Sequence, residues 1–383
     1  MRRARGTGHG SFSKTVLDID QNVLDFIQNV FEEKKAVSET SRAIGLKELA
    51  RVLGLSVPTV SRALGGYSDV SQKTRERVVQ AAREHGYVAS RAGRMLVSGR
   101  SNAIGMMLPQ PAGQITDAFV GEFLLGLADS LAELGRDLFL AASSQSRDEL
   151  QVLRHMVDGS QADGIVINRL TVDDARARVL IARRIPFVAH GRLIEAPGPY
   201  SWLDTDGEKA LDGLARQLVS LGHRRFALVM PDVAYTFAHF RSRGLERALS
   251  ELGLPLRPDH IAKVAPNDHD GAHAEARALL SLDPRPTAVI ALTDQLAFAV
   301  LEVARELGLG VPGDVSVVGF DNVPMAVYAN PPLTTFDQNI RESGRIAGDM
   351  VVARIELGEA GIRTLLLEPK LELRASHGPA PAD

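Results

Sequence analysis

From Asn102 onwards, short apolar runs of strand length alternate with longer segments of helical periodicity, and this alternation limits the fold more than any other feature. Strands buried on both faces are typically continuous apolar runs, and helices join them in parallel sheets. The segment of residues 102–375 is too long for one small sheet with its helices, so we expect an α/β body of two doubly wound parallel-sheet subdomains. The expected strands are 103–108, 138–142, 164–167, 187–189, 226–230, 288–292 and 315–320, and the expected helices begin near Phe119, Asp148, Asp206, Arg241, Asp270, Asp294 and Asn339.

Residues 44–90 have a different, all-α pattern. Apolar residues from Leu46 to Leu53 recur at the i, i+3, i+4 and i+7 positions of one short helix. Gly54 supplies a turn, Ser56 can cap a second helix over 57–64, and Ser71 can cap a third. Three short helices with a tight turn between the first two predict a helix-turn-helix, and a plain helical bundle is the alternative.

The net charge of −3 conceals a division along the chain. Residues 44–100 contain ten Lys and Arg against four Asp and Glu, whereas residues 101–383 contain 27 against 37. A basic block on an acidic body is compatible with DNA binding by the block alone.

The second helix of the basic block is polar, and Ser56, Thr59, Ser61 and Arg62 can face outward from it. The second helix of a helix-turn-helix lies in the major groove, where Arg62 can read a guanine. The Ser56, Thr59 and Ser71 hydroxyls can donate to phosphates. The charges after Ser71 have an equally good interpretation as a solvated helix face; they are Lys73, Arg75 and Arg77.

Polar residues follow three of the expected strands of the body. They are His190 and Arg192, then Thr293 and Asp294, and finally Asp321. Ligands of parallel α/β sheets lie at the carboxyl ends of strands, and carboxylates with an arginine suit the hydroxyls of a sugar. Asp294 is equally compatible with a helix N-cap, Asp321 with a turn, and His190 with a hydrogen-bonded pocket wall.

Other protein classes find little support. The chain contains no cysteine, no apolar run approaches 18 residues, and no apolar segment follows the arginines of the N-terminus. We therefore expect a cytoplasmic protein without a membrane segment. No nucleophile motif, phosphate-binding loop or metal-spaced histidine cluster predicts an enzyme, a cofactor or a metal, and the isolated His223 fits a turn after a helix.

The two ends of the chain are less informative. Residues 1–43 form an extension of unknown role, in which spaced apolar residues allow either an accessory segment or a helix that packs on a partner. Gly378, Pro379 and Pro381 predict a flexible tail over residues 376–383.

Several motifs together resemble the lactose/galactose repressor (LacI) family over about residues 44–373. They are TVSR at 59–62, GY at 86–87, LGHRRFALV at 221–229, TDQLAFAV at 293–300, VPGDVSVVGFDN at 311–322 and PPLTTFDQ at 331–338. The resemblance implies a helix-turn-helix domain over 44–90, a hinge over 91–101, and a periplasmic-binding-protein-like body over 102–375 that binds an effector and dimerises.

By this resemblance, Val57, Pro58 and Arg62 read bases, and Lys47 lies near the DNA backbone. Leu96 of the hinge takes the place of a leucine that wedges into the minor groove, a contact that bends DNA. The hinge departs from the family at Ala89-Ser90, where Pro-Asn is usual, and at Gly93, where alanine is usual; a helical glycine costs about 1 kcal/mol.

The resemblance also assigns effector contacts in the body. Arg241 matches the arginine that grips the effector, and Asp321 matches its carboxylate partner. Phe119 takes an aromatic position, Thr293 a position often held by Asn, and His269 lies near a stacking position.

The function implied is a transcriptional regulator, here expected to be a repressor. A homodimer would bind operator DNA under the control of a small effector, and the sign of that control is open. GGYSDVS at 65–71 and VAHGR at 188–192 look like the branch that controls α-glucoside and related sugar uptake, with a purine or another small polar metabolite as the alternative effector. A sugar-binding protein of an uptake system is the alternative from another class.

Overall fold

The computed structural model describes residues 44–65, 67, 69–87, 100–108, 118–143 and 147–382. The chain forms two compact units with a boundary between residues 99 and 100. We call residues 44–87 the head and residues 100–382 the body. The predictions for residues 1–43, for Ala89-Ser90, for Gly93 and for the wedge at Leu96 lie outside the described residues.

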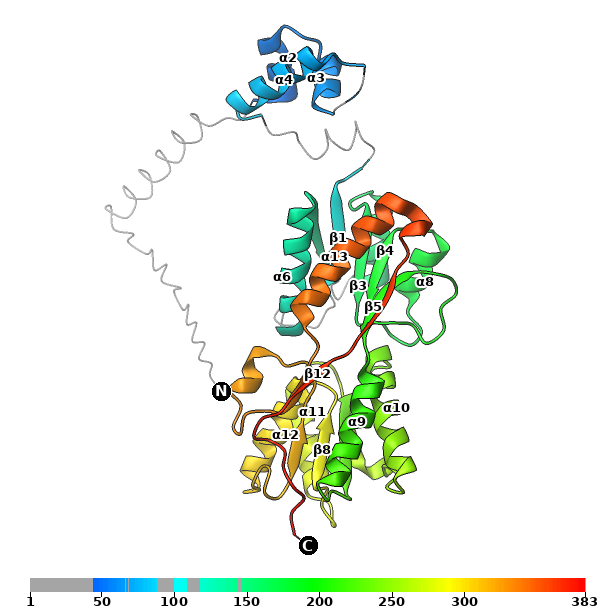
Figure 1. The fold of residues 1–383 in the computed structure, drawn as a ribbon, viewed down its shortest axis with the longest axis vertical. Coiled ribbons are helices and arrows are strands. Elements are labelled where there is room, and N and C mark those ends of the chain that lie inside the picture. Colours follow the sequence, from blue (N-terminus) through cyan, green and yellow to red (C-terminus); the bar gives the residue numbers. More distant parts are fainter. Residues whose placement is uncertain are drawn as a thin grey trace, which may run out of the picture. The chain divides into compact units, whose positions relative to one another are not determined.

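The head consists of three helices, as predicted. Gly54, at a φ of 65°, makes the turn after the first helix, and the Ser56 hydroxyl accepts from the Thr59 N–H at 3.2 Å. The helices close over a small core in which Leu49, Val60 and Val78 are fully buried. They are α2 (Leu46–Leu53), α3 (Val57–Leu64) and α4 (Gln72–Glu84), shown in Figure 1.

The N-terminal half of the body, here called the N-subdomain, contains a parallel sheet in the order β11-β5-β4-β3-β1-β2. Successive strand residues point to opposite faces, so its strands are buried under α6 and α13 on one face and under α7 and α8 on the other. The strands are β1 (Ala103–Leu108), β2 (Asp137–Ala142), β3 (Gly164–Asn168), β4 (Phe187–His190), β5 (Ser201–Thr205) and β11 (Thr364–Leu367). The helices are α6 (Ala118–Glu133), α7 (Glu149–Asp158), α8 (Ala175–Ala182) and α13 (Ile340–Leu357).

The other half, the C-subdomain, repeats this design with four parallel strands in the order β7-β6-β8-β9. Helices α9 and α10 cover one face, and α11 and α12 cover the other. The strands are β6 (Phe226–Pro231), β7 (Ile261–Val264), β8 (Ala288–Ala291) and β9 (Ser316–Val318). The helices are α9 (Gly207–Ser220), α10 (Thr236–Glu251), α11 (His269–Leu280) and α12 (Asp294–Glu306).

The chain passes between the subdomains after β5, before α13 and after β11 (Figure 1). A short antiparallel pair runs along the last two passages, formed by β10 (Thr335–Asp337) and β12 (Lys370–Glu372). The described part of the body also contains the 3-10 turns η1 (Pro258–His260), η2 (Pro324–Val327) and η3 (Gly358–Gly361). The prediction of two doubly wound α/β subdomains is confirmed.

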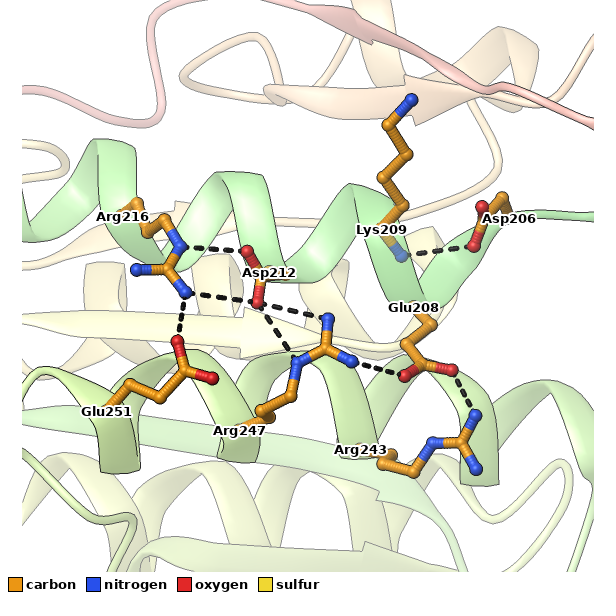
Figure 2. Close-up of polar contacts among 8 residues, drawn as sticks. All are labelled: Asp206, Glu208, Lys209, Asp212, Arg216, Arg243, Arg247 and Glu251. Atoms are coloured by element: carbon orange, nitrogen blue, oxygen red, sulfur yellow. Dashed lines mark hydrogen bonds and ion pairs between the residues drawn. The ribbon is translucent and has the colours of Figure 1, made fainter.

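Two helix pairs pack unusually closely, α6 against α13 and α9 against α10. A Cβ added to Gly244 of α10 would lie 2.0 Å from the Glu208 carbonyl oxygen of α9, so only glycine fits there. On the outer side, ion pairs join the same two helices (Figure 2). They involve Glu208, Asp212 and Arg216 of α9 with Arg243, Arg247 and Glu251 of α10.

The structure differs from the predicted elements at several places. Helix α10 begins at Thr236, whereas we predicted a start near Arg241. The sequence does not reveal this start, because no side chain caps the helix and aromatic residues occupy its first turns. Helix α8 was not predicted. Its inner face carries the buried Arg176, which pairs with Asp174 at 2.7 Å, and a charged residue on that face interrupts the apolar pattern by which a helix is recognised. Strands β5, β7, β10, β11 and β12 were not predicted either.

The C-terminal segment also differs from the flexible tail that we predicted. The fully buried Ser376 donates its hydroxyl to the Val317 carbonyl at 2.6 Å, and the Gly378 N–H donates to Ser316 Oγ at 3.0 Å. His223, in the turn after α9, lies with Nε2 3.0 Å from the Gly378 oxygen. These bonds hold residues 376–378 to the C-subdomain, so glycine and proline content misled the prediction.

Candidate functional site

A cavity of about 440 Å³ lies between the two subdomains of the body. It opens where strands of both sheets end, at the carboxyl edge where ligands of doubly wound sheets bind. Both subdomains contribute to it: Phe119, His190 and Asp204 come from the N-subdomain, and Arg241 and Asp321 from the C-subdomain.

Arg241 is the buried cation of the cavity. Its side chain is only 6% exposed, and one of its terminal nitrogens lies 3.6 Å from Asp321 Oδ1. Its guanidinium stacks on Phe320 at 3.6 Å and faces Phe237 at 4.7 Å, so aromatic rings fix its plane. Burial lowers the pKa of Arg241, and Asp321 opposes that shift. The paired guanidinium can donate to two ligand oxygens at once.

Asp321 is held in an unusual backbone conformation. Its φ is 127°, a region that costs a non-glycine residue about 1–3 kcal/mol. A bridge to Asp337 and a bond from its own N–H to the Phe336 carbonyl at 3.0 Å hold it there, and Gln338 Nε2 donates to its carboxylate at 2.6 Å. Burial raises the pKa of Asp321 to about 7, although Arg241 pulls it down. Such strain is typical of ligand-binding residues.

His190, at the end of β4, forms part of the opposite wall. Its ring lies 5.6 Å from the Phe119 ring and 4.9 Å from the Phe123 ring. Burial, with a smaller effect of the Arg241 charge, lowers the pKa of His190 to about 4. The imidazole is therefore neutral at physiological pH and offers a ligand one donor and one acceptor.

Arg192, which we predicted to contact the effector, does not line the cavity. Its Nε lies 3.3 Å from Asp204 Oδ2, and its guanidinium covers the Phe240 ring at 4.1 Å. Asp204 lines the cavity instead, at the end of β5. Burial raises the pKa of Asp204 to about 6, and Arg192 opposes the shift. Arg192 thus supports a cavity carboxylate that the sequence reasoning missed because β5 was not predicted.

Thr293 and Asp294 have different roles. Thr293 lines the cavity and caps α12, its hydroxyl accepting from the Leu296 N–H at 3.4 Å. Asp294 is fully buried outside the lining, where it accepts from the Val323 N–H at 2.9 Å and from the Thr335 hydroxyl at 2.5 Å. Asp294 is therefore neither the cap nor a ligand contact, and it fixes the segment that follows Asp321.

The remaining predicted residues, Phe119 and His269, both line the cavity. Several lining residues were not predicted from the sequence: Arg169, Tyr235, Phe237, Phe240, Gln295, Phe298 and Gln338. Gln338 stands in the motif PPLTTFDQ, so its place in that motif was the available signal.

In the head, α3 presents its polar side to solvent. Arg62 is exposed and lies 3.2 Å from the exposed Asp69, an ion pair worth about 0–1 kcal/mol that a DNA contact can replace. Arg75 and Arg77, by contrast, donate to the Tyr67 and Leu53 carbonyls at 2.7 and 2.6 Å. The predicted DNA contacts that lie within the described residues are at least partly exposed: Lys47, Ser56, Val57, Pro58, Thr59, Ser61, Arg62 and Ser71.

Among the helices of the described ranges, none has the length and apolar character needed to cross a bilayer. The described residues also contain no group of three or more His, Asp or Glu side chains arranged to hold a metal ion.

Comparison with known proteins adds to this geometry. Residues 45–90 match the model of bacterial regulatory proteins of the lacI family, and residues 215–377 match a periplasmic binding protein-like domain. The HTH-type transcriptional regulator AglR of Rhizobium meliloti (strain 1021) is 38% identical over 343 residues, covering 88% of this chain and 95% of that protein.

Two solved structures are also similar. The transcriptional regulator CelR in complex with cellobiose has a TM-score of 0.66 at 29% identity, covering 87% of this chain and 99% of that one. The lac repressor dimer bound to operator and the anti-inducer ONPF shares the fold, with a TM-score of 0.73 at 24% identity, covering 88% of this chain and 99% of that one. These relatives are regulators, so they do not support the alternative of an uptake protein.

Proposed function

Since the chain belongs to the LacI family and is a DNA-binding transcriptional regulator, we propose that it is a repressor whose affinity for an operator is controlled by a sugar bound in the body. The observation that carries this proposal is that one chain combines an exposed helix-turn-helix with a cavity built around Arg241 and Asp321. The effector is bound without chemical change, and the protein works in the cytoplasm, where its operator lies.

DNA recognition in this proposal belongs to α3. Its N-terminus carries Val57 and Pro58, and Arg62 stands about one turn further on, in the order that suits a helix entering the major groove. Ser56 and Ser71 lie at the N-termini of α3 and α4, where hydroxyls and backbone N–H groups favour phosphate oxygens. Two heads of a homodimer would read the two halves of a pseudo-palindromic site.

The effector in this proposal is a sugar. The CelR complex contains cellobiose, and the cavity offers what a sugar needs: fixed carboxylates, an arginine and an amide for hydroxyls, and aromatic rings for the apolar faces. Because Arg241 and Asp321 belong to the C-subdomain and His190 and Asp204 to the N-subdomain, a ligand that contacts all four favours one packing of the subdomains. Binding to one packing better than to the other shifts the affinity for DNA.

The base-reading role of Arg62 can be tested by operator binding. Wild-type protein selects a site from a library of randomised duplexes, and shift assays then compare that site with random DNA. We expect Arg62→Ala to lose about 10–100-fold of affinity for the selected site and little for random DNA, because a bidentate contact to guanine contributes about 1–3 kcal/mol.

Arg51→Ala is the matched control. Arg51 is an exposed arginine of α2 that pairs with Glu48, so its loss removes the same charge without touching α3. Equal effects of the two substitutions, or undiminished discrimination in Arg62→Ala, would show that Arg62 does not read bases.

A further inference from the structure

The sequence enters the body through a turn at Ser101 and Asn102. Ser101 is the last residue of the predicted hinge, and Asn102 directly precedes β1. Ser101 is only 2% exposed, and Asn102 has a φ of 56°, a left-handed conformation that asparagine adopts more readily than most residues. The connection between head and body therefore ends in a buried turn of defined shape.

The carboxylate of Asp163, which directly precedes β3, binds this turn. Its Oδ1 accepts from the Ser101 N–H at 2.7 Å and from the Ser101 hydroxyl at 2.9 Å, and its Oδ2 accepts from the Asn102 N–H at 2.9 Å. The Asp163 side chain is 10% exposed. A charged acceptor that lost these donors would stay largely desolvated, so the three bonds hold the turn firmly.

Arg136, which directly precedes β2, holds the turn from another side. One of its terminal nitrogens donates to Asn102 Oδ1 at 3.0 Å and lies 3.7 Å from Asp163 Oδ2. The other terminal nitrogen donates to Glu356 Oε1 at 3.2 Å. The Asn102 side-chain amide also donates to the Gly135 carbonyl at 2.7 Å. Since Gly135 follows α6 and Glu356 belongs to α13, the turn is tied to the ends of both helices.

Helices α6 and α13 form a rigid support for these bonds. A Cβ added to Gly126 would lie 1.8 Å from the Arg341 carbonyl oxygen, and one added to Gly344 would lie 2.1 Å from the Phe123 carbonyl oxygen. Because backbone packs on backbone at both places, the helices cannot slide past each other without losing this contact. The turn at Ser101 therefore keeps one direction relative to the N-subdomain.

We propose that Asp163 and Arg136 are positioning residues for DNA binding, because they anchor the chain at Ser101 and Asn102 and so give the connection to the head a fixed starting point. The inference rests on the proposed function, since it assumes that two heads of a homodimer bind one pseudo-palindromic site. Once the first head is bound, the second binds at an effective concentration that falls as the connecting chain gains freedom. An anchored end limits that freedom.

The test compares three duplexes in shift assays of the full chain, at about 50 mM salt so that weak binding is measurable. They are the operator that wild-type protein selects from randomised duplexes, the same operator with one half scrambled, and the same operator with two base pairs inserted at its centre. Linking two binding modules typically adds about 10²–10⁴-fold, so we expect wild type to prefer the full site to the half-site by that factor. Asp163→Asn should lose at least about tenfold of this preference and keep the half-site affinity.

The inserted base pairs separate a loss of positioning from a loss of stability. Two base pairs turn one half-site by about 70° relative to the other, so wild type should lose most of its preference for the full site on this duplex. Asp163→Asn should bind the original and the lengthened site more equally, whereas general destabilisation would weaken both. Ser101→Ala removes one of the three donors and should have a smaller effect of the same kind.

Asp158→Asn is the matched control. Asp158 is an exposed aspartate at the end of α7 in the same subdomain, where it pairs with Arg183 at 2.7 Å. The substitution makes the same chemical change away from the turn and should leave the binding of all three duplexes unchanged. Sedimentation velocity of each variant measures whether the dimer is kept.

Four results would overturn the inference. A wild-type preference for the full site in Asp163→Asn, or equal effects of Asp163→Asn and Asp158→Asn, would show that the turn does not position the heads. A loss that accompanies dissociation into monomers would assign Asp163 to dimer stability instead. If wild type itself did not prefer the full site, two-headed binding in the proposed function would fail, and the inference with it.

Discussion

At the scale of single residues, Asp321 combines burial, backbone strain and an incomplete ion pair. An Asp in water titrates near 3.8, whereas burial raises the pKa of Asp321 to about 7 in the folded protein. Between these pH values the folded state holds a proton that the unfolded state has lost. Stability contributed by this group is therefore present at low pH and falls as the pH rises towards 7.

Asp321→Asn should remove this dependence, because asparagine has the shape of the protonated acid and cannot ionise. We expect the difference in Tm between the variant and wild type to be a few degrees larger, in favour of the variant, at pH 8 than at pH 5. For a domain of this size, about 1 kcal/mol of stability corresponds to roughly 2–4 °C in Tm. The opposite titration of His190, whose pKa falls to about 4, is present in both proteins and cancels in the difference. Thermal melting curves of both proteins between pH 5 and pH 8 measure this difference in Tm. A difference that does not change with pH would contradict the raised pKa of the buried Asp321 carboxyl.

At the scale of elements, the pairing of α9 with α10 positions Arg241. Gly244 lies about one turn after Arg241, and the ion pairs of Glu208 with Arg243 and Arg247 fix the two helices from outside (Figure 2). The contact at Gly244 leaves no room for a methyl group, because the obstacle is backbone. The rotation of α10, and hence the place of Arg241 in the cavity, depends on a glycine outside the cavity.

Gly244→Ala should destabilise the body by about 1–3 kcal/mol through overpacking and weaken effector binding. Gly213→Ala is the matched control: Gly213 lies within α9 with open space around its Cα, so alanine should stabilise the helix by up to about 1 kcal/mol. Denaturant unfolding of both variants measures the difference. Equal effects would mean that α9 and α10 can move apart freely.

The same scale shows what the sequence can and cannot predict. Strands such as β1 and β3 were predicted because burial on both faces makes them continuously apolar. The edge strand β11 was missed, since its side chains are mostly exposed and only its pairing with β5 defines it. We predicted Arg192 as an effector contact from its position after β4. In the structure it pairs with Asp204, and this ion pair holds it behind the cavity wall. Contacts between distant segments carry no local signal.

At the scale of the whole molecule, the opposite charges of residues 44–100 and 101–383 separate DNA binding from effector binding. Exposed cations of the head can release counterions from DNA, whereas the acidic body is repelled by phosphates. The division of the chain into a basic block (residues 44–100) and an acidic remainder could be predicted from the sequence, because charged residues can be counted without knowing the fold.

Operator affinity should therefore fall steeply with salt, by about 10³–10⁵ between 50 and 200 mM if the dimer contacts 6–10 phosphates. Lys47→Gln should reduce the slope of log K against log[salt] by about 1 for each head, because Lys47 is exposed on α2 and is predicted to lie near the DNA backbone. Lys209→Gln removes an equal charge from the body, where Lys209 pairs with Glu368, and should leave the slope unchanged. If both substitutions changed the slope equally, the body would share the phosphate contacts, and the charge division would not be the functional boundary.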